Sequence, residues 1–301
     1  MSIFTGSGVA VCTPFDEGGA FNYGAYEKLI RDLIEGGSDA IVTCGTTGEV
    51  STLYFDEHVE VARAAVEIVK KATEGKRKVP VVSGAGGNDT RHCAELGREL
   101  VRAGVDACMY VTPYYNKTSQ RGLVEHYSRL ASEVDAPIII YNIQMRTGMN
   151  MEPATFKKLS SIENIAAVKE ASGNIVQVAE IAELCGDSLD IYSGNDDYVL
   201  PILSLGGKGV ISTVANIMPD KIHELVQKFF DGDIKGSREI QLGILPLVRA
   251  IFKDVNPMPI KAALNIMGYE MGRCRMPLTT VDEKLAEELK KQLTDYNLIN
   301  R

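Results

Sequence analysis

The chain has 301 residues, 45% of them hydrophobic and 24% charged, which suffices for one large core or two small ones. Its formal net charge of −8 argues against a basic surface for nucleic acid or an anionic membrane. No stretch reaches the ~18 consecutive apolar residues of a membrane span, and the first residues lack the basic and apolar parts of a secretory leader. We therefore expect a cytoplasmic protein without nucleic-acid or membrane partners.

The six cysteines and four histidines do not form a metal-binding pattern. The cysteines include no CxxC pair, and three of them lie within apolar segments, so we expect reduced, packed thiols. The histidines are scattered and form no HExxH motif. We expect no metal site.

Short apolar segments recur along the chain and predict buried β-strands. They begin near Val9, Ala40, Val79, Ala107, Ile138, Ile165, Asp190 and Gly209. Nearly continuous apolar character is typical of parallel strands that are covered on both faces. The stretches between them have helical spacing, as in the series Tyr26, Leu29, Ile30, Leu33 and Ile34.

Eight strands, each followed by a helix, predict an α/β fold of the (β/α)8 TIM-barrel type over residues 1–232. Strand signals stop after about Asp231, and helical stretches remain at 234–252, 257–267 and 281–296. Residues 233–301 are therefore expected to form a C-terminal helical appendage. The alternative is an open, doubly wound sheet, which usually carries a glycine-rich fingerprint after its first strand. This chain has Val11-Cys12-Thr13-Pro14-Phe15 there.

Lys169 is the most informative polar residue at a strand end, where the chemistry of such a barrel lies. It follows four apolar strand residues, so its ammonium is expected to be partly desolvated, which lowers a lysine pKa. At the reference pKa only about 0.04% of a lysine is the neutral nucleophile at pH 7. Burial would therefore raise its reactivity toward a carbonyl. The alternative is a lysine that caps the strand or pairs with Glu170.

Other strand ends supply possible partners for Lys169. Tyr141 ends the adjacent strand and could transfer protons, or it could simply close the barrel top. Thr46 and Thr47 lie on a glycine-flanked turn that could bind a carboxylate or relay a proton, or be an ordinary turn. Arg146 could hold a substrate carboxylate, or be a solvated loop residue.

Several motifs, in order, resemble the dihydrodipicolinate synthase family, within the superfamily that also holds N-acetylneuraminate lyase. The resemblance runs from Gly6 to about Leu278. The matching segments are Gly45 to Glu49 (GTTGE), Thr112 to Asn116 (TPYYN), Val168 to Gly173 around the Schiff-base lysine, Gly206 to Ser212 (GGxGVIS) and Asn256 to Lys261 (NPxPxK).

The resemblance implies a lyase that condenses pyruvate with L-aspartate 4-semialdehyde in lysine and diaminopimelate biosynthesis. It implies that Lys169 forms the imine with pyruvate, without a metal or organic cofactor. Tyr141 would be the central acid and base, and Thr46 would link it to Tyr115 in a proton relay. In the family the residue matching Tyr115 reaches into the neighbouring subunit's site. A homodimer at least is therefore expected, usually paired into a tetramer.

The resemblance also implies the substrate contacts. Thr47 would bind the pyruvate carboxylate and Arg146 the carboxylate of the semialdehyde adduct, with Gly194 and Ile211 at strand ends also in contact with substrate. Arg146 favours the synthase over relatives that cleave sugar acids and tend to carry an apolar residue there. The family usually has a proline where this chain has Gln144, which frees φ and restores an N–H beside Arg146.

A lysine-feedback site exists in some family members, and its matching positions here are possible allosteric residues: Ser51, His58, Asn88, His92 and Tyr114. Lysine-sensitive members typically carry a glutamate where this chain has His92. A histidine cannot supply that fixed negative charge. We therefore predict weak or absent inhibition by lysine.

Two alternative functions remain open from the sequence. One is a pyruvate-dependent aldolase that acts on another aldehyde or sugar acid. The other is a non-catalytic barrel that binds a 2-oxo acid as a sensor, against which the presence of all four relay residues argues. These are Thr46, Tyr115, Tyr141 and Lys169.

Overall fold

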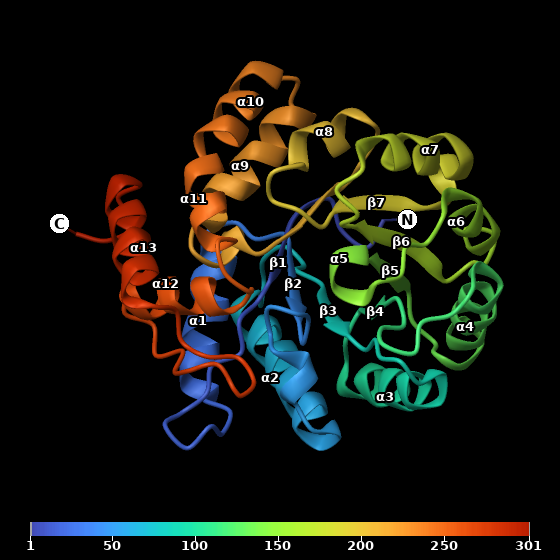
Figure 1. Ribbon diagram of the computed structural model, residues 1–301, viewed down its shortest axis with the longest axis horizontal. Helices are drawn as coiled ribbons and strands as arrows, with labels where there is room; N and C mark the ends of the chain where they lie inside the picture. The colour runs from blue at the N-terminus through green and yellow to red at the C-terminus, as the bar shows by residue number, and fades with distance from the viewer. Residues whose placement is uncertain (1, 301) are drawn as a thin grey trace.

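The computed structural model describes residues 2–300, and its eight strands close into a barrel in chain order (Figure 1). The strands are β1 Gly6–Ala10, β2 Ala40–Thr43, β3 Val81–Gly84, β4 Ala107–Val111, β5 Ile138–Asn142, β6 Ile165–Glu170, β7 Asp190–Ser193 and β8 Gly209–Ser212. Every neighbouring pair is parallel, and β1 pairs with β8. The predicted TIM barrel is confirmed, and the closing pair excludes the open sheet.

Two strands begin elsewhere than predicted. β1 begins at Gly6, before Val9. Its first residues are small ones that allow β8 to approach closely, so they do not appear as a hydrophobic segment in the sequence. A Cβ on Gly209 would lie 1.9 Å from the carbonyl oxygen of Gly6. β3 begins at Val81, since Pro80 has no N–H to donate to the ladder.

Helices follow the strands and cover the outside of the barrel. They are α1 Tyr23–Glu35, α2 Phe55–Ala72, α3 Thr90–Ala103, α4 Gln120–Glu133, α5 Gln144–Thr147, α6 Pro153–Leu159, α7 Ile175–Cys185, α8 Val199–Ser204 and α9 Pro219–Phe230, with 3₁₀ turns η1 Val50–Thr52, η2 Gly186–Ser188 and η3 Val214–Asn216. Four of the helices begin after a residue whose side chain accepts a backbone N–H of the first turn, which is a strong start signal. These residues are Asn22, Asp89, Ser119 and Asn174.

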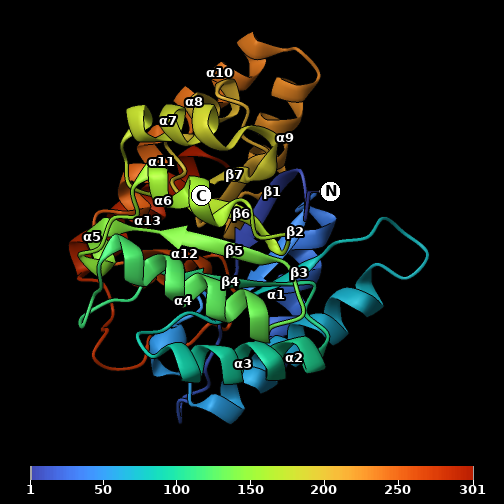
Figure 2. The same ribbon diagram turned by 90° about the vertical axis from the view of Figure 1, so that its right-hand side faces the viewer.

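The C-terminal segment is helical: α10 Ile234–Gly243, α11 Leu245–Ile251, α12 Met258–Ile266 and α13 Glu283–Asp295. The helix predicted over 234–252 is divided at Ile244, because Pro246 falls in the first turn of α11 and cannot donate to the preceding helix. In Figure 2 the amino terminus and α5 lie at opposite ends of the barrel, with α12 and α13 toward the α5 end. Within residues 2–300, none of the helices combines the length and hydropathy needed to cross a bilayer.

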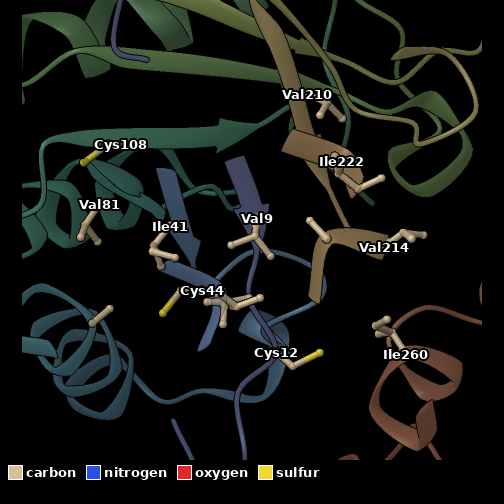
Figure 3. Packing of buried hydrophobic residues seen from close by; sticks show 14 of the residues in the cluster. Val9, Cys12, Ile41, Cys44, Val81, Cys108, Val210, Val214, Ile222 and Ile260 are labelled. Carbon is tan, nitrogen blue, oxygen red and sulfur yellow. The ribbon is translucent and has the colours of Figure 1, made fainter. Parts of the chain in front are cut away.

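Buried apolar side chains form two clusters. The inner one fills the barrel and is closed at the amino-terminal end by Phe4, whose ring stacks on Tyr192 at 4.3 Å between centroids. The outer one lies between strands and helices, as Figure 3 shows, and includes Ile260 of α12 together with Cys12 and Val214. The C-terminal helices therefore share the outer core of the barrel.

Candidate active site

Lys169 and Tyr141 are paired across β5 and β6 and enter the barrel together. The Lys169 side chain is buried, and its Nζ lies 4.3 Å from the centre of the Tyr141 ring. Burial lowers the pKa of Lys169 to about 8; the charge of Asp196 opposes this shift and that of Arg146 adds to it. Near neutral pH the amine is thus much closer to its nucleophilic form than an ordinary lysine.

Glu170 is not the partner of Lys169. Side chains alternate along a strand, so Glu170 points to the opposite face of β6. There its buried carboxylate accepts hydrogen bonds from Asn142 Nδ2 at 3.0 Å and from the Ser172 N–H at 2.7 Å. The interpretation of Lys169 as an ordinary ion-pair residue is therefore not supported.

Tyr141 is a proton donor at neutral pH. Burial raises its pKa to about 12, while the charge of Arg146 and a hydrogen bond with the Thr46 side chain act in the opposite direction. Thr46 lies on the turn after β2 and is partly exposed. The structure therefore brings Thr46, Tyr141 and Lys169 together.

The two predicted carboxylate-binding residues meet at Asn256, in the loop between α11 and α12. Asn256 Nδ2 donates to Thr47 Oγ1 at 3.0 Å, and Arg146 Nη2 donates to the Asn256 backbone carbonyl at 3.1 Å. The Thr213 hydroxyl lies 3.4 Å from that of Thr47. Asn256 was not recognised as a site residue from the sequence, where the NPxPxK motif indicated only a helix start.

Gly194 and Ile211 also lie in the barrel interior. A Cβ on Gly194 would be 2.7 Å from the Ala171 Cβ and 3.2 Å from the Lys169 Cγ, so this position packs against the stem of the lysine. Ile211 is buried in the inner cluster, which also contains Tyr141.

Asp196 is a second residue whose role the sequence did not reveal. Its carboxylate is buried and accepts hydrogen bonds from the N–H groups of Thr213 and Val214 at 3.1 and 3.2 Å, and from the Ser212 hydroxyl. Burial raises the pKa of Asp196, and these hydrogen bonds oppose the shift. The only sequence signal was its position after a buried strand.

A cavity of about 610 Å³ opens beside this group. Its wall includes Thr46, Tyr141, Arg146 and Asn256, while Lys169 lies next to Tyr141 and not on the wall itself. The five possible allosteric residues also line it: Ser51, His58, Asn88, His92 and Tyr114. The catalytic and allosteric candidates thus share one cavity.

Tyr115 is not brought to Thr46 within one chain. Its side chain is 91% exposed, it is absent from the cavity wall, and its backbone is left-handed with φ at +68°. A role in the relay would need a second copy of the chain.

The two histidines that line the cavity differ in burial. His58 is buried with Nε2 2.8 Å from the Gly84 carbonyl oxygen, and burial lowers its pKa to about 4, so it is neutral. His92 is exposed and packs edge-on against Phe55. Across residues 2–300, no group of three or more His, Cys, Asp or Glu side chains could hold a metal ion.

Known proteins resemble this chain along its whole length. The Dihydrodipicolinate synthetase family matches residues 3–296. A 4-hydroxy-tetrahydrodipicolinate synthase of Acetivibrio thermocellus is 52% identical over 99% of both chains. A dihydrodipicolinate synthase structure from Aquifex aeolicus is 40% identical with a TM-score of 0.93, covering 98% of this chain and 99% of that one.

A further structure is a chloride-inhibited dihydrodipicolinate synthase of Acinetobacter baumannii complexed with pyruvate. It is 35% identical with a TM-score of 0.93, and the match covers 98% of this chain and 99% of that one. The family predicted from the sequence motifs is confirmed: this chain belongs to the Dihydrodipicolinate synthetase family.

Proposed function

We propose that this chain condenses pyruvate with L-aspartate 4-semialdehyde, the activity of a 4-hydroxy-tetrahydrodipicolinate synthase in lysine and diaminopimelate biosynthesis. The observation that carries the proposal is the buried Lys169 with its pKa lowered to about 8, beside the Tyr141 phenol. A relative with that enzyme name matches at 52% identity, which supports the lyase activity predicted from the sequence.

The residues divide the chemistry as follows. The neutral Lys169 amine adds to the pyruvate carbonyl, and Tyr141 supplies the proton that lets water leave, giving an iminium. Loss of a methyl proton gives an enamine, which forms a carbon–carbon bond to the aldehyde carbon, whose oxygen takes up a proton. The semialdehyde's amine then closes on the imine carbon and releases Lys169.

Thr47 binds the pyruvate carboxylate and Arg146 the carboxylate of the second substrate, with Gly194 and Ile211 beside the imine. The guanidinium fork suits a planar carboxylate. The sequence of covalent steps on Lys169 needs no metal or organic cofactor.

The active protein is proposed to be a homo-oligomer, a tetramer built as a dimer of dimers. Tyr115 supports this, since it is 91% exposed on a loop of the catalytic end and can complete the relay with Thr46 only from a second copy. We also propose a cytoplasmic location, because the six cysteines are free thiols and five of them are buried. Residues 1–232 would form the catalytic barrel and 233–301 the appendage.

Borohydride reduction in the presence of pyruvate, followed by peptide mass mapping, tests the imine. An adduct on Lys169 is expected, and an adduct on another lysine, or none, would refute the assignment. A coupled assay of pyruvate with a panel of aldehydes tests the second substrate. Failure to turn over aspartate semialdehyde while another aldehyde reacts would favour the alternative aldolase.

Inhibition by lysine is proposed to be weak or absent. The cavity wall that carries Ser51, Asn88 and Tyr114 has the exposed His92 at the position where lysine-sensitive family members typically carry a glutamate. A His92→Glu variant should be more sensitive to lysine than the natural chain in a turnover assay. Inhibition of the natural chain at micromolar lysine would contradict this proposal.

A further inference from the structure

Asn256 connects the two groups to which the proposed function assigns the substrate carboxylates. Its side chain is buried and lies on the cavity wall, with Nδ2 3.0 Å from Thr47 Oγ1. Its backbone carbonyl oxygen, not its side chain, lies 3.1 Å from Arg146 Nη2. We propose that Asn256 is a positioning residue: its side chain orients Thr47 and thereby sets the affinity of the site for pyruvate, while its backbone carbonyl places Arg146 for the second substrate. This inference rests on the proposed function.

The contact with Thr47 orients its hydroxyl. Because Asn256 donates to the Thr47 oxygen, the hydroxyl's own proton stays available for an acceptor. In the structure Thr213 Oγ1 lies 3.4 Å away, longer than a good hydrogen bond between hydroxyls. A substrate carboxylate would be a better acceptor, since hydrogen bonds to an ionised group are shorter and stronger.

The contact with Arg146 holds the guanidinium without neutralising it. Arg146 lies on the short helix α5, after the exposed Met145. Among residues 2–300 its guanidinium hydrogen-bonds only to the neutral backbone carbonyl of Asn256. A carboxylate partner would cancel its charge, whereas a carbonyl leaves the charge for a ligand. Asn256 thus fixes a donor for one carboxylate and a cation for the other.

Asn256 is itself anchored by a buried ion pair five residues along the chain. Lys261 Nζ lies 2.6 Å from Glu49 Oε1, and both side chains are at most 2% exposed. Glu49 ends the same turn that carries Thr47, and its other oxygen accepts the Arg275 N–H at 2.8 Å. The C-terminal segment therefore contacts the catalytic turn at three points, through Asn256, Lys261 and Arg275.

Comparison with Asn265 separates this role from ordinary structural support. Asn265, an exposed residue of α12, uses both ends of its amide, with Nδ2 donating to the Gly272 carbonyl and Oδ1 accepting the Met271 N–H, each at 2.9 Å. Asn256 uses only Nδ2, and its buried Oδ1 has no partner within residues 2–300. Buried structural amides are normally satisfied, so a half-used amide on a cavity wall indicates a site residue.

The experiment compares Asn256→Ala and Asn256→Asp with the matched control Asn265→Ala. Borohydride trapping titrated with pyruvate gives the half-saturating concentration, and a coupled assay with aspartate semialdehyde gives its KM and kcat. For Asn256→Ala we expect the half-saturating pyruvate concentration to rise about tenfold, the loss of roughly one hydrogen bond to a charged group. The KM for aspartate semialdehyde and kcat should stay within about threefold, because the backbone carbonyl that holds Arg146 remains.

Asn256→Asp should raise the half-saturating pyruvate concentration further, because its carboxylate accepts the Thr47 proton and repels pyruvate, although its shape is unchanged. Asn265→Ala should lower the melting temperature and leave the half-saturating pyruvate concentration unchanged. These three results together support positioning of Thr47 by the Asn256 side chain.

The inference is overturned if both Asn256 variants keep the half-saturating pyruvate concentration within twofold of that of the natural chain, or if Asn265→Ala raises it equally. Should the alanine variant not fold, the isosteric aspartate variant decides the question by the same measurements. A natural chain that forms no imine with pyruvate would refute the proposed function and this inference together. A natural chain that turns over normally, with unchanged Asn256 variants, refutes the inference alone.

Discussion

Replacing Lys169 with methionine should abolish the activity and stabilise the fold. The lysine ammonium is buried in the barrel, and burial lowers its pKa from 10.5 to about 8. A lowered lysine pKa means that the protonated side chain is less stable in the folded protein than in the unfolded chain. Methionine has a similar unbranched shape and no charge to desolvate.

The magnitude follows from that pKa. The difference is about 2.5 units, and each unit corresponds to about 1.4 kcal/mol, so the buried charge costs roughly 3 kcal/mol at pH 7. The attraction of Asp196 is already contained in the pKa. Loss of the cation–π contact with Tyr141 destabilises the variant by about 1 kcal/mol. We expect a net gain of about 2 kcal/mol, which is roughly 3 °C in melting temperature for a chain of this length.

Thermal unfolding at matched protein concentration, from pH 7 to pH 10.5, is the assay. Below pH 8 both the folded and the unfolded lysine are protonated and the full cost applies. Between pH 8 and 10.5 the folded lysine is neutral while the unfolded one still binds its proton, so folding releases a proton and the cost falls with each pH unit. The advantage of Lys169→Met should therefore fade, and it should be nearly lost at pH 10.5, where the unfolded lysine also loses its charge. Lys290→Met, at an exposed position of α13, is the matched control and should change little. A methionine variant no more stable at pH 7, or an advantage that persists at pH 10.5, would refute the reasoning.

Three further predictions concern the same site and its support. The rate of imine formation should rise between pH 6 and 8 as Lys169 deprotonates and then level off; a rate still rising at pH 10 in stopped-flow or trapping experiments would contradict the lowered pKa. Gly194→Ala should lower kcat at least about tenfold, since its methyl would lie 3.2 Å from the Lys169 Cγ and displace the amine; an unchanged single-turnover rate would be inconsistent with that contact. Lys261→Met should destabilise the fold by about 3–5 kcal/mol, because Glu49 is left buried and unpaired, while adding Glu49→Gln should restore much of the loss in denaturant unfolding; simple addition of the two losses would contradict the pairing.

Much of the fold was predictable because its signals are local. A strand buried on both faces must be apolar along its length, and the segments at Ile138 and Ile165 have that property. The start of β1 was not predictable in this way, since Gly6 is selected by the approach of a backbone about two hundred residues away. The division of 234–252 could have been predicted from Pro246 alone, because proline favours the first turn of a helix and interrupts a longer one.

The site was predictable to the same extent. Lys169 and Tyr141 end neighbouring apolar strands, so sequence order and alternation suffice to place them together. Asn256 contacts a residue 209 positions earlier, and no local pattern reveals a hydrogen bond of that span. Asp196 is hidden for another reason: a carboxylate after a strand is usually solvated, and only the folded chain shows that it is buried near Lys169.

The catalytic pair shows why the arrangement of charges matters beyond the identity of the residues. Burial alone favours the neutral form of both partners, lowering the pKa of Lys169 and raising that of Tyr141. Arg146 lowers both values, which helps the lysine lose its proton and keeps the phenol from becoming too weak an acid. Asp196 opposes the shift at Lys169. Imine formation needs a neutral amine and a protonated acid in contact at the same pH, and these opposing effects provide that combination near neutrality. Arg146, which the sequence suggested only as a carboxylate-binding group, therefore also sets the acidity of the pair to which that substrate is delivered.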